Sequence, residues 1–536
     1  MEMVNKRSIN TSDSRLPIGW VKIELKQLGQ YINGRAFKPT EWKTTGLPII
    51  RIQNLNNSAA IFNHSPLQHE RKYLVKEGDL LMAWSASLGV YIWDKKDAWL
   101  NQHIFKVIPN TYLVTKRFLY YALQEAIEEF YLKSHGSGIV HITKPVFESH
   151  EIPIPPLEEQ KRIVDKLDAI MDKVEGNKRR LEKIPVLLKR FRQAVLAAAV
   201  SGRLTEEWRE ENSGLNGKNC LKESYNERLI IYNKNLTKSK TDNQRKPSRP
   251  CDLVIIENGD FDIPQSWIVT IPELIASPVR YSLAIGPFGS NLKISDYKKS
   301  GIPLIFVRHI KSNEFIGLNP KYVSEDKAKE LMPHSIEPLD LLITKMGEPP
   351  GDCEIYPENM PKAIITADCL KFQVWSKYFD RIYFKHLINS SLIREQLGII
   401  TQGVAQQKIS LERFKTLHFP LPPPEEQKEI VRKIELLFSF ADKIEARYAK
   451  AKAMLDKLPQ TILAKAFRGE LVAQDPSDES VSVLLVSINA EKESIALAKA
   501  GRKAEGQNGR KVLKTAPEKN TLKAEKSKRA KIKNGR

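Results

Sequence analysis

A long stretch with the pattern of a helix occurs twice in this chain, and the two copies align without a gap. The first copy begins with Pro-Pro-Leu-Glu-Glu-Gln-Lys at 155–161, and the second begins with Pro-Pro-Pro-Glu-Glu-Gln-Lys at 422–428. The same offset of 267 positions pairs the ends of the copies, at Gly202 and Gly469. A duplication within the chain is the simplest explanation.

Each copy carries the start and stop signals of one long helix. Proline precedes it, paired glutamates lie where the helix dipole favours negative charge, and Gly202 or Gly469 suits the position after the last turn. Pro185 and Pro459 lie inside the predicted helices. Because proline removes a backbone hydrogen bond, we expect a kink or a lost bond at each.

Apolar residues recur at alternating steps of three and four positions in both copies, which is typical of a coiled-coil seam. The predicted seam positions are Ile163, Leu167, Ile170, Val174, Asn177, Leu181 and Leu188 in the first copy, and Ile430, Ile434, Leu437, Ile444, Leu455, Leu458 and Ile462 in the second. A buried Asn at 177 would set the register of the seam. One such helix alone would most simply cover its own domain, but two copies in identical register favour packing against each other.

Both helices are also expected to expose apolar side chains outside this seam, and such surfaces mark contacts with partners. The examples are Val164, Val186 and Leu187 in the first copy, and Val431 and Met454 in the second.

The chain has 536 residues, 41% of them hydrophobic, which is enough for several domains with their own cores. Its four cysteines form no C-x-x-C pair, so neither a structural zinc site nor a disulfide framework is predicted, and a reducing compartment fits. Residues 1–15 are polar, and no apolar run approaches membrane-spanning length. We therefore expect a cytoplasmic protein without a membrane partner.

The formal net charge of +21 favours a polyanionic partner, and DNA or RNA is the usual one. Part of this excess lies in residues 491–536, which are basic, contain few large apolar residues and are expected to be disordered. This tail could add to non-specific DNA association or serve only as a solvated extension.

The segments that precede the two long helices correspond as well. Both open with Pro-x-x-Trp, at 17–20 and 264–267, and both contain strand-like runs, which indicates α+β domains. The predicted organisation is a polar segment 1–15, a first variable domain 16–152, a first helical spacer 153–204, a linker 205–255 with some helix near 206–211, a second variable domain 256–419, a second helical spacer 420–490 and a basic tail 491–536. Similar frames with different interiors suggest two related modules that bind different targets.

No catalytic or metal-binding motif stands out in the sequence. The phosphate-binding, dinucleotide-binding and H-E-x-x-H patterns are absent, and the glycines of 286–290 and 347–351 are better interpreted as turns. Scattered histidines such as His103, His141 and His309 are more often structural than catalytic. We therefore predict no catalytic residue and no metal site.

Three pairs of polar loops have the composition of segments that read base edges, because Arg, Gln and Asn bond bidentately to guanine or adenine. The candidate DNA-binding residues are Arg51, Gln53, Asn54, Asn57, Ser85, Ser87 and Ser137 in the first domain, and Arg308, His309, Lys311, Asn313, Lys345, Gln402, Gln406, Gln407 and Lys408 in the second. Any one of them could be an ordinary surface residue, but the set as a whole favours DNA contact.

With these features in view, the chain resembles the specificity (S) subunit of a type I restriction-modification system. The resemblance rests on the two P-P-x-E-E-Q-K helix starts, on the helix ends at 196–204 and 463–471, on the Pro-x-x-Trp openings and on Gly-Pro-Phe-Gly-Ser at 286–290. It covers about residues 16 to 490, and the basic tail lies beyond it.

The resemblance implies an α+β protein with two target-recognition domains joined by two long conserved helices packed as an antiparallel coiled coil. Each domain would read one half of a bipartite site in double-stranded DNA. Methyltransferase (M) subunits, two of them, would dock on the helices and methylate adenine with S-adenosylmethionine, and restriction (R) subunits would add cleavage that depends on ATP and Mg.

This chain itself would bind no cofactor and catalyse no reaction. In agreement, it lacks the Asn/Asp-Pro-Pro-Tyr/Phe signature expected of adenine methyltransferases. Two alternatives stay open at this point: a self-contained methyltransferase or nuclease with an unrecognised site, and a coiled-coil scaffold without sequence preference.

Overall fold

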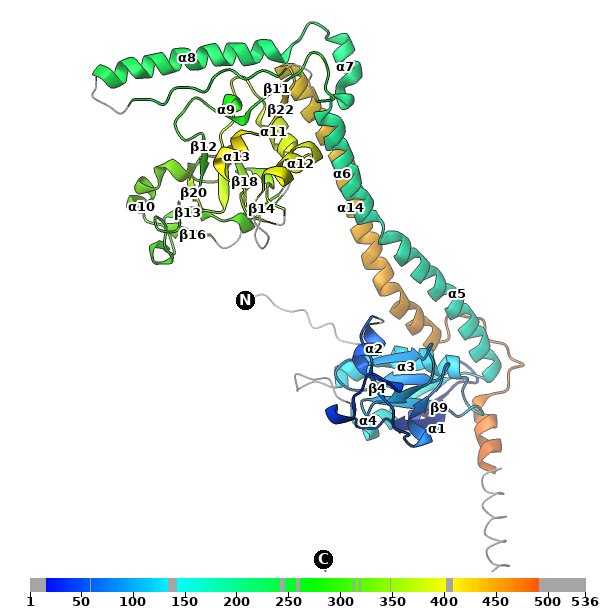
Figure 1. Ribbon diagram of the computed structural model, residues 1–536. Helices are drawn as coiled ribbons and strands as arrows, with labels where there is room; N and C mark the ends of the chain where they lie inside the picture. The colour runs from blue at the N-terminus through cyan, green and yellow to red at the C-terminus, as the bar shows by residue number, and fades with distance from the viewer. Residues whose placement is uncertain are drawn as a thin grey trace, which may run out of the picture. The chain divides into compact units, whose positions relative to one another are not determined.

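A computed structural model describes residues 16–57, 59–133, 142–241, 246–256, 261–311, 314–317, 320–347, 349–401 and 408–490. The chain divides into two compact units, coloured along the sequence in Figure 1. Unit 1 contains the residues up to Lys178 and those from Ala453 onward, and unit 2 contains Arg179–Lys452. Each unit thus combines one variable domain with the start of the helix that follows it and the end of the other long helix.

The described residues of unit 1 form two four-stranded sheets and a separate strand pair. The strands are β2 (Gly29–Asn33), β9 (Ile104–Pro109), β6 (Leu80–Ala83) and β7 (Gly89–Ile92) in that order in one sheet, β4 (Asn63–Ser65), β3 (Leu47–Ile50), β8 (Ala98–Leu100) and β5 (Leu74–Val75) in the other, and β1 (Val21–Glu24) paired with β10 (Glu151–Ile154). All pairs are antiparallel except β3 with β8.

Unit 2 repeats this arrangement and adds a short antiparallel strand pair, β14 (Ile310–Lys311) with β15 (Glu314–Phe315). Its sheets are β12 (Leu283–Ile285), β21 (Cys369–Phe372), β18 (Leu341–Thr344) and β19 (Cys353–Ile355), then β16 (Lys321–Val323), β13 (Ile302–Ile305), β20 (Ala363–Ile365) and β17 (Ser335–Ile336), and the strand pair is β11 (Ile268–Thr270) with β22 (Phe419–Leu421). The parallel pair recurs as β13 with β20. This shared topology confirms the prediction of two related α+β domains.

The central strands explain why two sheets pack in each unit. In β6, Leu80 and Met82 belong to the core that contains the long helices, whereas Leu81 and Ala83 belong to the core of the second sheet. Successive side chains of a strand point to opposite faces, so a strand that is apolar throughout is buried on both sides. The continuous apolar run of β18 behaves in the same way.

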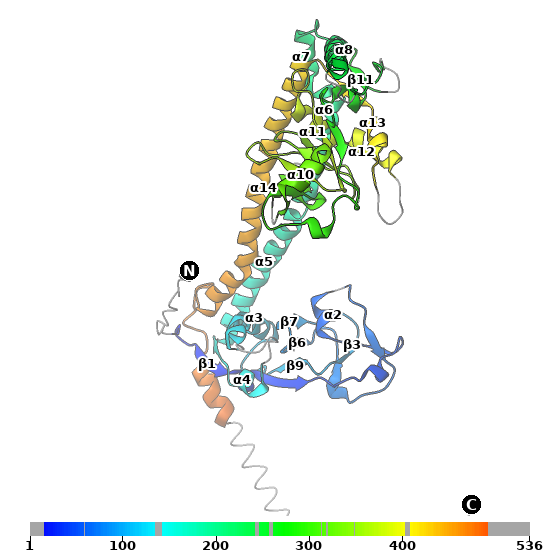
Figure 2. The same ribbon diagram turned by 90° about the vertical axis from the view of Figure 1, so that its left-hand side faces the viewer.

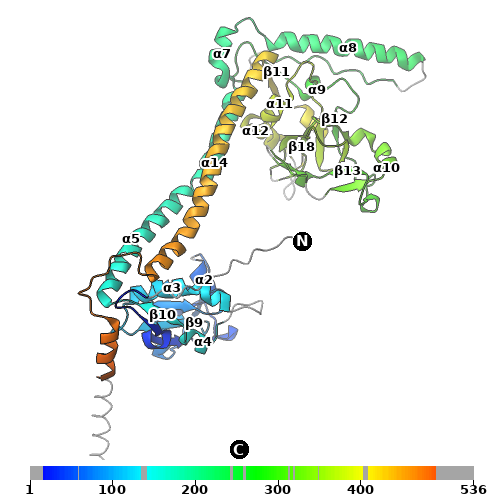
Figure 3. The ribbon, with the colours of Figure 1, turned by 180° about the vertical axis from the view of Figure 1, so that it is seen from behind.

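Helices lie between the sheets and the long helices in each unit. In unit 1 this position belongs to α3 (Lys116–Lys133), as Figure 2 shows. In unit 2 it belongs to α11 (Arg381–Ile388) and α12 (Ser391–Ile400), which lie between β18 and the paired long helices (Figure 3).

The two copies of the long helix differ in continuity. The second copy is one helix, α14 (Pro424–Phe467), with Pro459 inside it. The first copy is two helices, α5 (Leu157–Leu181) and α6 (Ile184–Val200), so the prediction of a single helix is wrong there. The break agrees with the expected effect of Pro185, because a proline ring clashes with the carbonyl four residues earlier, and that residue is the last of α5.

The long helices run antiparallel where they pack within each unit. In unit 1, the core holds Ile163 and Leu167 of α5 together with Ile462 and Phe467 of α14. In the same unit Lys178 Nζ lies 3.3 Å from an oxygen of Asp456, further from the start of α5 and the end of α14. In unit 2, the end of α6 packs on the start of α14, where one core contains Val195, Leu196, Val200, Ile430, Val431 and Ile434. The predicted antiparallel pairing is confirmed.

Two predicted seam residues are not buried, namely Asn177 and Leu458. Asn177 therefore cannot set the register as a buried polar residue. The remaining predicted seam positions are buried or half-buried.

The predicted linker contains more helix than the sequence indicated. Besides α7 (Glu206–Glu211), it forms the 25-residue helix α8 (Gly217–Thr241), which packs on the variable domain of unit 2 through Leu221 and Arg228. The guanidinium of Arg228 donates to the carbonyl oxygens of Leu274 and Ala276, at 3.1 and 2.5 Å. Of the helices in the described ranges, none combines the length and apolar character needed to cross a membrane.

Candidate nucleic-acid interface and helix junctions

In unit 2, the polar loops from three distant parts of the sequence come together at one end of the strands. The N–H of Lys345 donates to the carbonyl of Asp368 at 2.8 Å, and its carbonyl accepts from Ile409 at 3.0 Å. Met346 forms a bridge with Lys408. The turn that contains Asp368 also reaches the end of β13, where the N–H of Thr366 donates to Ile305 at 2.9 Å, three residues before Arg308.

Unit 1 brings its loops together through the same backbone contacts. Trp84 follows β6 as Lys345 follows β18. Its backbone N–H donates to the carbonyl of His103 at 3.2 Å, and its carbonyl accepts from the N–H of Ile142 at 3.3 Å. The short helix α2 (Ile52–Asn56) adds a side-chain link, because Asn56 Nδ2 donates to Ser87 Oγ at 3.1 Å. In each unit, these contacts bring together loops from separate parts of the sequence.

Several predicted DNA-binding side chains are at least partly accessible on these loops. Gln53, Asn57, Arg308, Lys311 and Lys408 are exposed, and Arg51, Ser87 and Lys345 are half-buried. The two arginines are stacked on aromatic rings, Arg51 at 5.0 Å from Trp42 and Arg308 at 4.1 Å from Phe306. Stacking holds a guanidinium in place and so reduces the entropy lost when it binds.

Three predicted contacts must be corrected, because their side chains face the protein interior. Asn54 is 4% exposed, and its amide nitrogen donates to the carbonyls of Ala60 and Ile61. His309 is 3% exposed, and its Nδ1 accepts from the N–H of Phe306 at 3.3 Å. Ser85 is buried as well. Asn54 and His309 hold the turns that follow β3 and β13, so their role is structural.

The other predicted contacts lie outside the described residues. These are Ser137, Asn313, Gln402, Gln406 and Gln407.

The described residues offer little to redox, thiol or metal chemistry. Within the described ranges, no group of three or more His, Cys, Asp or Glu side chains is arranged to hold a metal ion. Burial raises the pKa of Cys220 and of Cys369 to about 12, so both thiols stay protonated. The accessible candidate contact residues are hydrogen-bonding and cationic side chains on loops.

A second shared feature is the junction at which each long helix starts. Trp20 donates its indole N–H to Glu159 at 3.0 Å, and Trp267 donates to Glu426 at 2.7 Å. These are the Pro-x-x-Trp tryptophan and the second glutamate of the helix motif in each unit. In each unit, therefore, the Pro-x-x-Trp motif binds the helix-start motif and fixes the variable domain to its helix.

The glutamine of the helix motif strengthens the same junction. In unit 1, Gln160 accepts from the N–H of Thr115 at 2.9 Å and donates to the carbonyl of Pro155 at 3.0 Å. In unit 2, Gln427 accepts from the backbone N–H of Asp380 at 2.8 Å and donates to the carbonyl of Pro422 at 2.9 Å. Both glutamine side chains are buried.

The glycine that ends each long helix completes the junction of the opposite domain. Gly202 has φ +77° and Gly469 has φ +74°, the left-handed conformation that suits glycine after the last turn of a helix. A Cβ atom on Gly202 would lie 2.3 Å from Pro264, and one on Gly469 would lie 2.4 Å from Pro17. Only glycine therefore lets the helix end approach the opening proline this closely.

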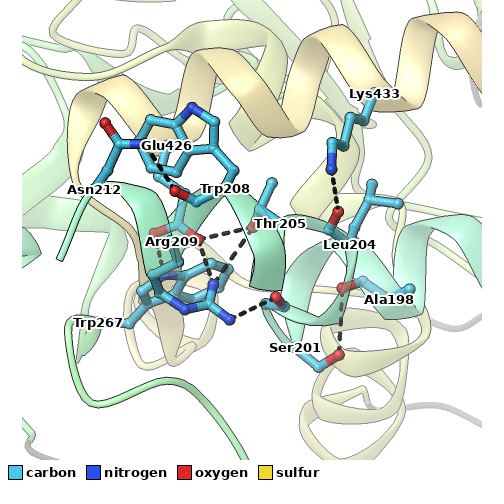
Figure 4. Close-up of polar contacts among 11 residues, drawn as sticks. Ala198, Ser201, Leu204, Thr205, Trp208, Arg209, Asn212, Trp267, Glu426 and Lys433 are labelled. Carbon is cyan, nitrogen blue, oxygen red and sulfur yellow. Dashed lines mark hydrogen bonds and ion pairs between the residues drawn. The ribbon is translucent and has the colours of Figure 1, made fainter.

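The charge environment of the two junctions differs. Glu426 accepts from Thr205 Oγ1 at 2.7 Å and from the Arg209 guanidinium at 2.5 Å, in addition to Trp267 (Figure 4). Lys433 also donates to the carbonyl of Leu204 at 3.1 Å, which ties α14 to the end of α6. In unit 1, Glu159 Oε1 is buried and has no hydrogen-bond partner among the described residues.

Burial raises the pKa of Glu159 above the ordinary carboxyl value, and the indole of Trp20 and the charge of Arg162 only partly oppose this effect. Arg162 is itself paired with Asp478, with its Nη2 2.7 Å from the carboxylate. A proton on Glu159 is therefore favoured more than on a solvated glutamate.

The helix dipole accounts for only part of the role of the paired glutamates, because the second glutamate and the glutamine of the motif are buried in both units. Their repetition together with the Pro-x-x-Trp openings was the available clue, because side chains that bind each other tend to be duplicated together.

Among the exposed apolar positions expected on the helices, Val186, Leu187 and Met454 are exposed at 53%, 58% and 63%. Val164 and Val431 are buried, which contradicts the prediction. Both valines follow a seam isoleucine near the start of a helix, where the variable domain covers them.

Comparisons with known proteins agree on one family. The family model described as "Type I restriction modification DNA specificity domain" matches residues 17–186 and 346–452. The EcoBI specificity subunit of Escherichia coli is 31% identical over 496 residues, which cover 90% of this chain and 94% of the relative. The EcoKI specificity subunit of Escherichia coli is 29% identical over 534 residues, covering 92% and 99%.

A solved structure has a similar fold. It comes from work on complex assembly and conformational transition of the type I R-M system, and it matches with a TM-score of 0.58 at 17% identity over 85% of this chain and 99% of its own.

Proposed function

Because this chain belongs to the family of type I restriction-modification DNA specificity proteins, we propose that each of its two units reads one half of a bipartite DNA sequence. The chain is a DNA sequence-specificity subunit. The observation that carries the proposal is the repetition of one strand order in both units with different polar residues at equivalent loops. A shared frame with different contact residues suits two different half-sites.

The proposed base and phosphate contacts are the side chains that extend from these loops. In unit 1 they are Arg51, Gln53, Asn57 and Ser87, and in unit 2 they are Arg308, Lys311, Lys345 and Lys408. Arg51 and Arg308 follow equivalent strands, β3 and β13. A stacked guanidinium suits bidentate contact with guanine, and the lysines suit phosphate or guanine.

The test is a selection from random double-stranded DNA by the full chain co-expressed with its methyltransferase subunits. We expect Arg308→Ala to relax the preference at one position of one half-site and to leave the other half-site intact. Lys234→Ala, an exposed lysine on α8, is the matched control and should leave the motif unchanged. Loss of preference in both half-sites would contradict independent reading by the two units.

We also propose that the long helices bind two methyltransferase subunits at equivalent positions. Leu187 and Met454 are related by the 267-residue offset of the repeat, and both are more than half exposed. Around Leu187 an open groove combines apolar and charged side chains, lined by Arg179, Glu182, Lys183, Val186 and Arg190. Exposed apolar groups inside a polar rim are typical of protein interfaces.

A charge at each of these positions tests the docking proposal. Leu187→Glu and Met454→Glu should each remove one methyltransferase subunit from the complex, and the double variant should remove both, as measured by mass photometry. Ile230→Glu on α8 is the control for an exposed apolar residue elsewhere, since Ile230 is 66% exposed. Full assembly of the double variant would contradict the docking surface.

Methylation of adenine and cleavage are proposed to belong to the methyltransferase and restriction subunits, with this chain supplying recognition alone. The purified chain should transfer no methyl group from S-adenosylmethionine to DNA until a methyltransferase subunit is added. Methyl transfer by the chain alone would contradict the assignment.

A further inference from the structure

The loop that connects β12 to β13 in unit 2, residues 286–297, is clamped at both ends to the proposed DNA surface. At its start, the N–H of Gly286 donates to the carbonyl of Cys369 at 3.0 Å. A Cβ atom on Gly286 would lie 1.9 Å from the carbonyl oxygen of Thr366, in the turn that holds Lys345. The start of the loop therefore lies directly against the proposed contact residues.

The end of the loop meets the other part of that surface. The rings of Tyr297 and Phe306 lie edge to face with 6.0 Å between their centroids. Phe306 is the ring on which the guanidinium of Arg308 is stacked. Both ends of the loop are thus fixed beside side chains proposed to contact DNA.

Between these anchors the loop presents apolar side chains to solvent. Phe288 is 69% exposed and Ile294 is 83% exposed, although Pro287 is buried and Leu292 packs on the core of the second sheet. Single exposed apolar side chains are ordinary on protein surfaces, so the informative feature is that Phe288 lies on a loop anchored beside the proposed contact residues. The exposed phenylalanine suggests a ligand that covers it.

The corresponding loop of unit 1, residues 34–42 after β2, has no such side chain. Phe37 is 7% exposed and packs against the ring of His69, and Trp42 lies under the guanidinium of Arg51. Arg35 completes this closed loop by pairing with Glu41 at 2.6 Å. An outward aromatic ring in this loop is therefore specific to unit 2.

We propose that Phe288 contacts base pairs directly and thereby contributes to the specificity of the half-site read by unit 2. This inference rests on the proposed function of that unit. Apolar side chains contact bases either at the methyl group of thymine or at a base step that they partly unstack, and a ring held by a short anchored loop suits both contacts. Because Phe288 carries no charge, its contribution does not depend on counterion release.

The experiment compares Phe288→Ala with wild type and with Ile230→Ala, whose side chain is similarly exposed but lies on α8. The full chain in complex with its methyltransferase subunits first selects a motif from a pool of random double-stranded oligonucleotides. Affinity for the selected duplex and for an unrelated duplex is then measured at several salt concentrations. Thermal unfolding checks that all three proteins are folded.

We expect Phe288→Ala to weaken binding of the selected duplex about tenfold, with no change on the unrelated duplex and no change in the salt dependence. Ile230→Ala should bind as wild type does. Wild-type affinity and an unchanged motif for Phe288→Ala would overturn the inference, and so would an equal loss on both duplexes. Failure of the wild-type complex to select any motif would instead overturn the proposed function, so the two failures are distinguishable.

Uracil in place of thymine in the selected half-site identifies which base contact is made, because it removes only the methyl group. If the ring contacts that methyl group, uracil should weaken wild type about as much as Phe288→Ala does, and the two changes together should cost no more than one. If wild type tolerates uracil while Phe288→Ala is still weak, the ring contacts a base step. Either result supports direct contact with base pairs.

Discussion

In unit 2 the buried carboxylate of Glu426 accepts hydrogen bonds from Trp267, Thr205 and Arg209, whereas in unit 1 Glu159 accepts one from Trp20. Two positions of the repeat explain the difference. The offset of 267 residues places Val472 and Pro476 where unit 2 has Thr205 and Arg209. The duplicated hydrogen bond thus attaches each domain to its helix, while the compensation of the buried charge is specific to unit 2.

The contacts between each variable domain and its long helix also differ in polarity. In unit 1, Arg117 of α3 forms an ion pair with Asp168 of α5, with Nη2 2.6 Å from the carboxylate. In unit 2 the corresponding contact is largely apolar, since His386 of α11 packs edge to face on Phe438 of α14 at 5.7 Å. Burial lowers the pKa of His386 to about 3, so this ring is neutral at physiological pH.

The largest difference between the units is expected when each buried glutamate is removed. Glu426→Ala would leave Arg209 and two further donors without their acceptor, and breaking a buried ion pair costs about 3–5 kcal/mol. Glu159→Ala would leave only the Trp20 indole unpaired, at about 1–3 kcal/mol. Hydrogen exchange in the first turns of α14 and α5 measures each junction separately. Equal losses would show that the charge network of unit 2 adds no stability.

Alanine at the two helix-ending glycines should affect both units alike. Gly202→Ala and Gly469→Ala each place a Cβ against a proline at a left-handed backbone position, and such strain costs about 1–3 kcal/mol. Gly176→Ala is the control, because Gly176 lies inside α5 with no atom near the added Cβ and should gain up to about 1 kcal/mol. Clearly unequal effects at the two glycines would contradict equivalent junctions.

A smaller effect is expected from pH at the junction of unit 1. The folded-state pKa of Glu159 is raised by burial, so the stability of its junction is greatest below the unfolded-state pKa and falls as pH rises through the raised value. Glu159→Gln should remove this pH dependence while keeping the size of the side chain. Asp478→Asn is the control for the neighbouring pair of Arg162. The same pH dependence in the Gln variant would assign it to another group.

The smallest effect is expected from the exposed ion pair of unit 1. The side chains of Arg117 and Asp168 are 43% and 38% exposed, and pairs of this kind contribute about 0.2–1 kcal/mol. Arg117→Ala should therefore destabilise unit 1 slightly, and high salt should reduce the difference from wild type. Unit 2 serves as the internal control. A loss well above 1 kcal/mol would show that Arg117 acts through packing on Tyr120 and Tyr121, which its guanidinium covers.

Much of the architecture followed from local patterns. The 267-residue offset, the prolines before the helices and the glycines after them predicted two domains and two helical spacers, because these signals depend on backbone preferences and on the spacing of apolar residues. The same reasoning failed at α8, whose sequence has no clear apolar period and whose helix is stabilised by contacts such as those of Arg228 with unit 2.

The candidate contacts show the limit of this reasoning most clearly. A polar residue after a strand can point outward, as Gln53 and Arg308 do, or turn inward to hold its own loop, as Asn54 and His309 do. In both units the residue three positions after the strand is exposed and the next residue turns inward. The polar character of the two residues does not distinguish them, because direction depends on which backbone groups of the folded turn need a partner.

The sequence by itself therefore determined the repeat, the helix ends and the class of fold, since each follows from interactions among near neighbours in the chain. The tertiary structure alone decided which glutamate meets an arginine, which asparagine is exposed and which phenylalanine faces solvent. Each of these outcomes depends on burial in the folded protein, and some depend on distant partners, such as Thr205, which lies 221 positions from Glu426 in the sequence. No local pattern specifies such a partner, because it arises only when the packed elements bring the two side chains together.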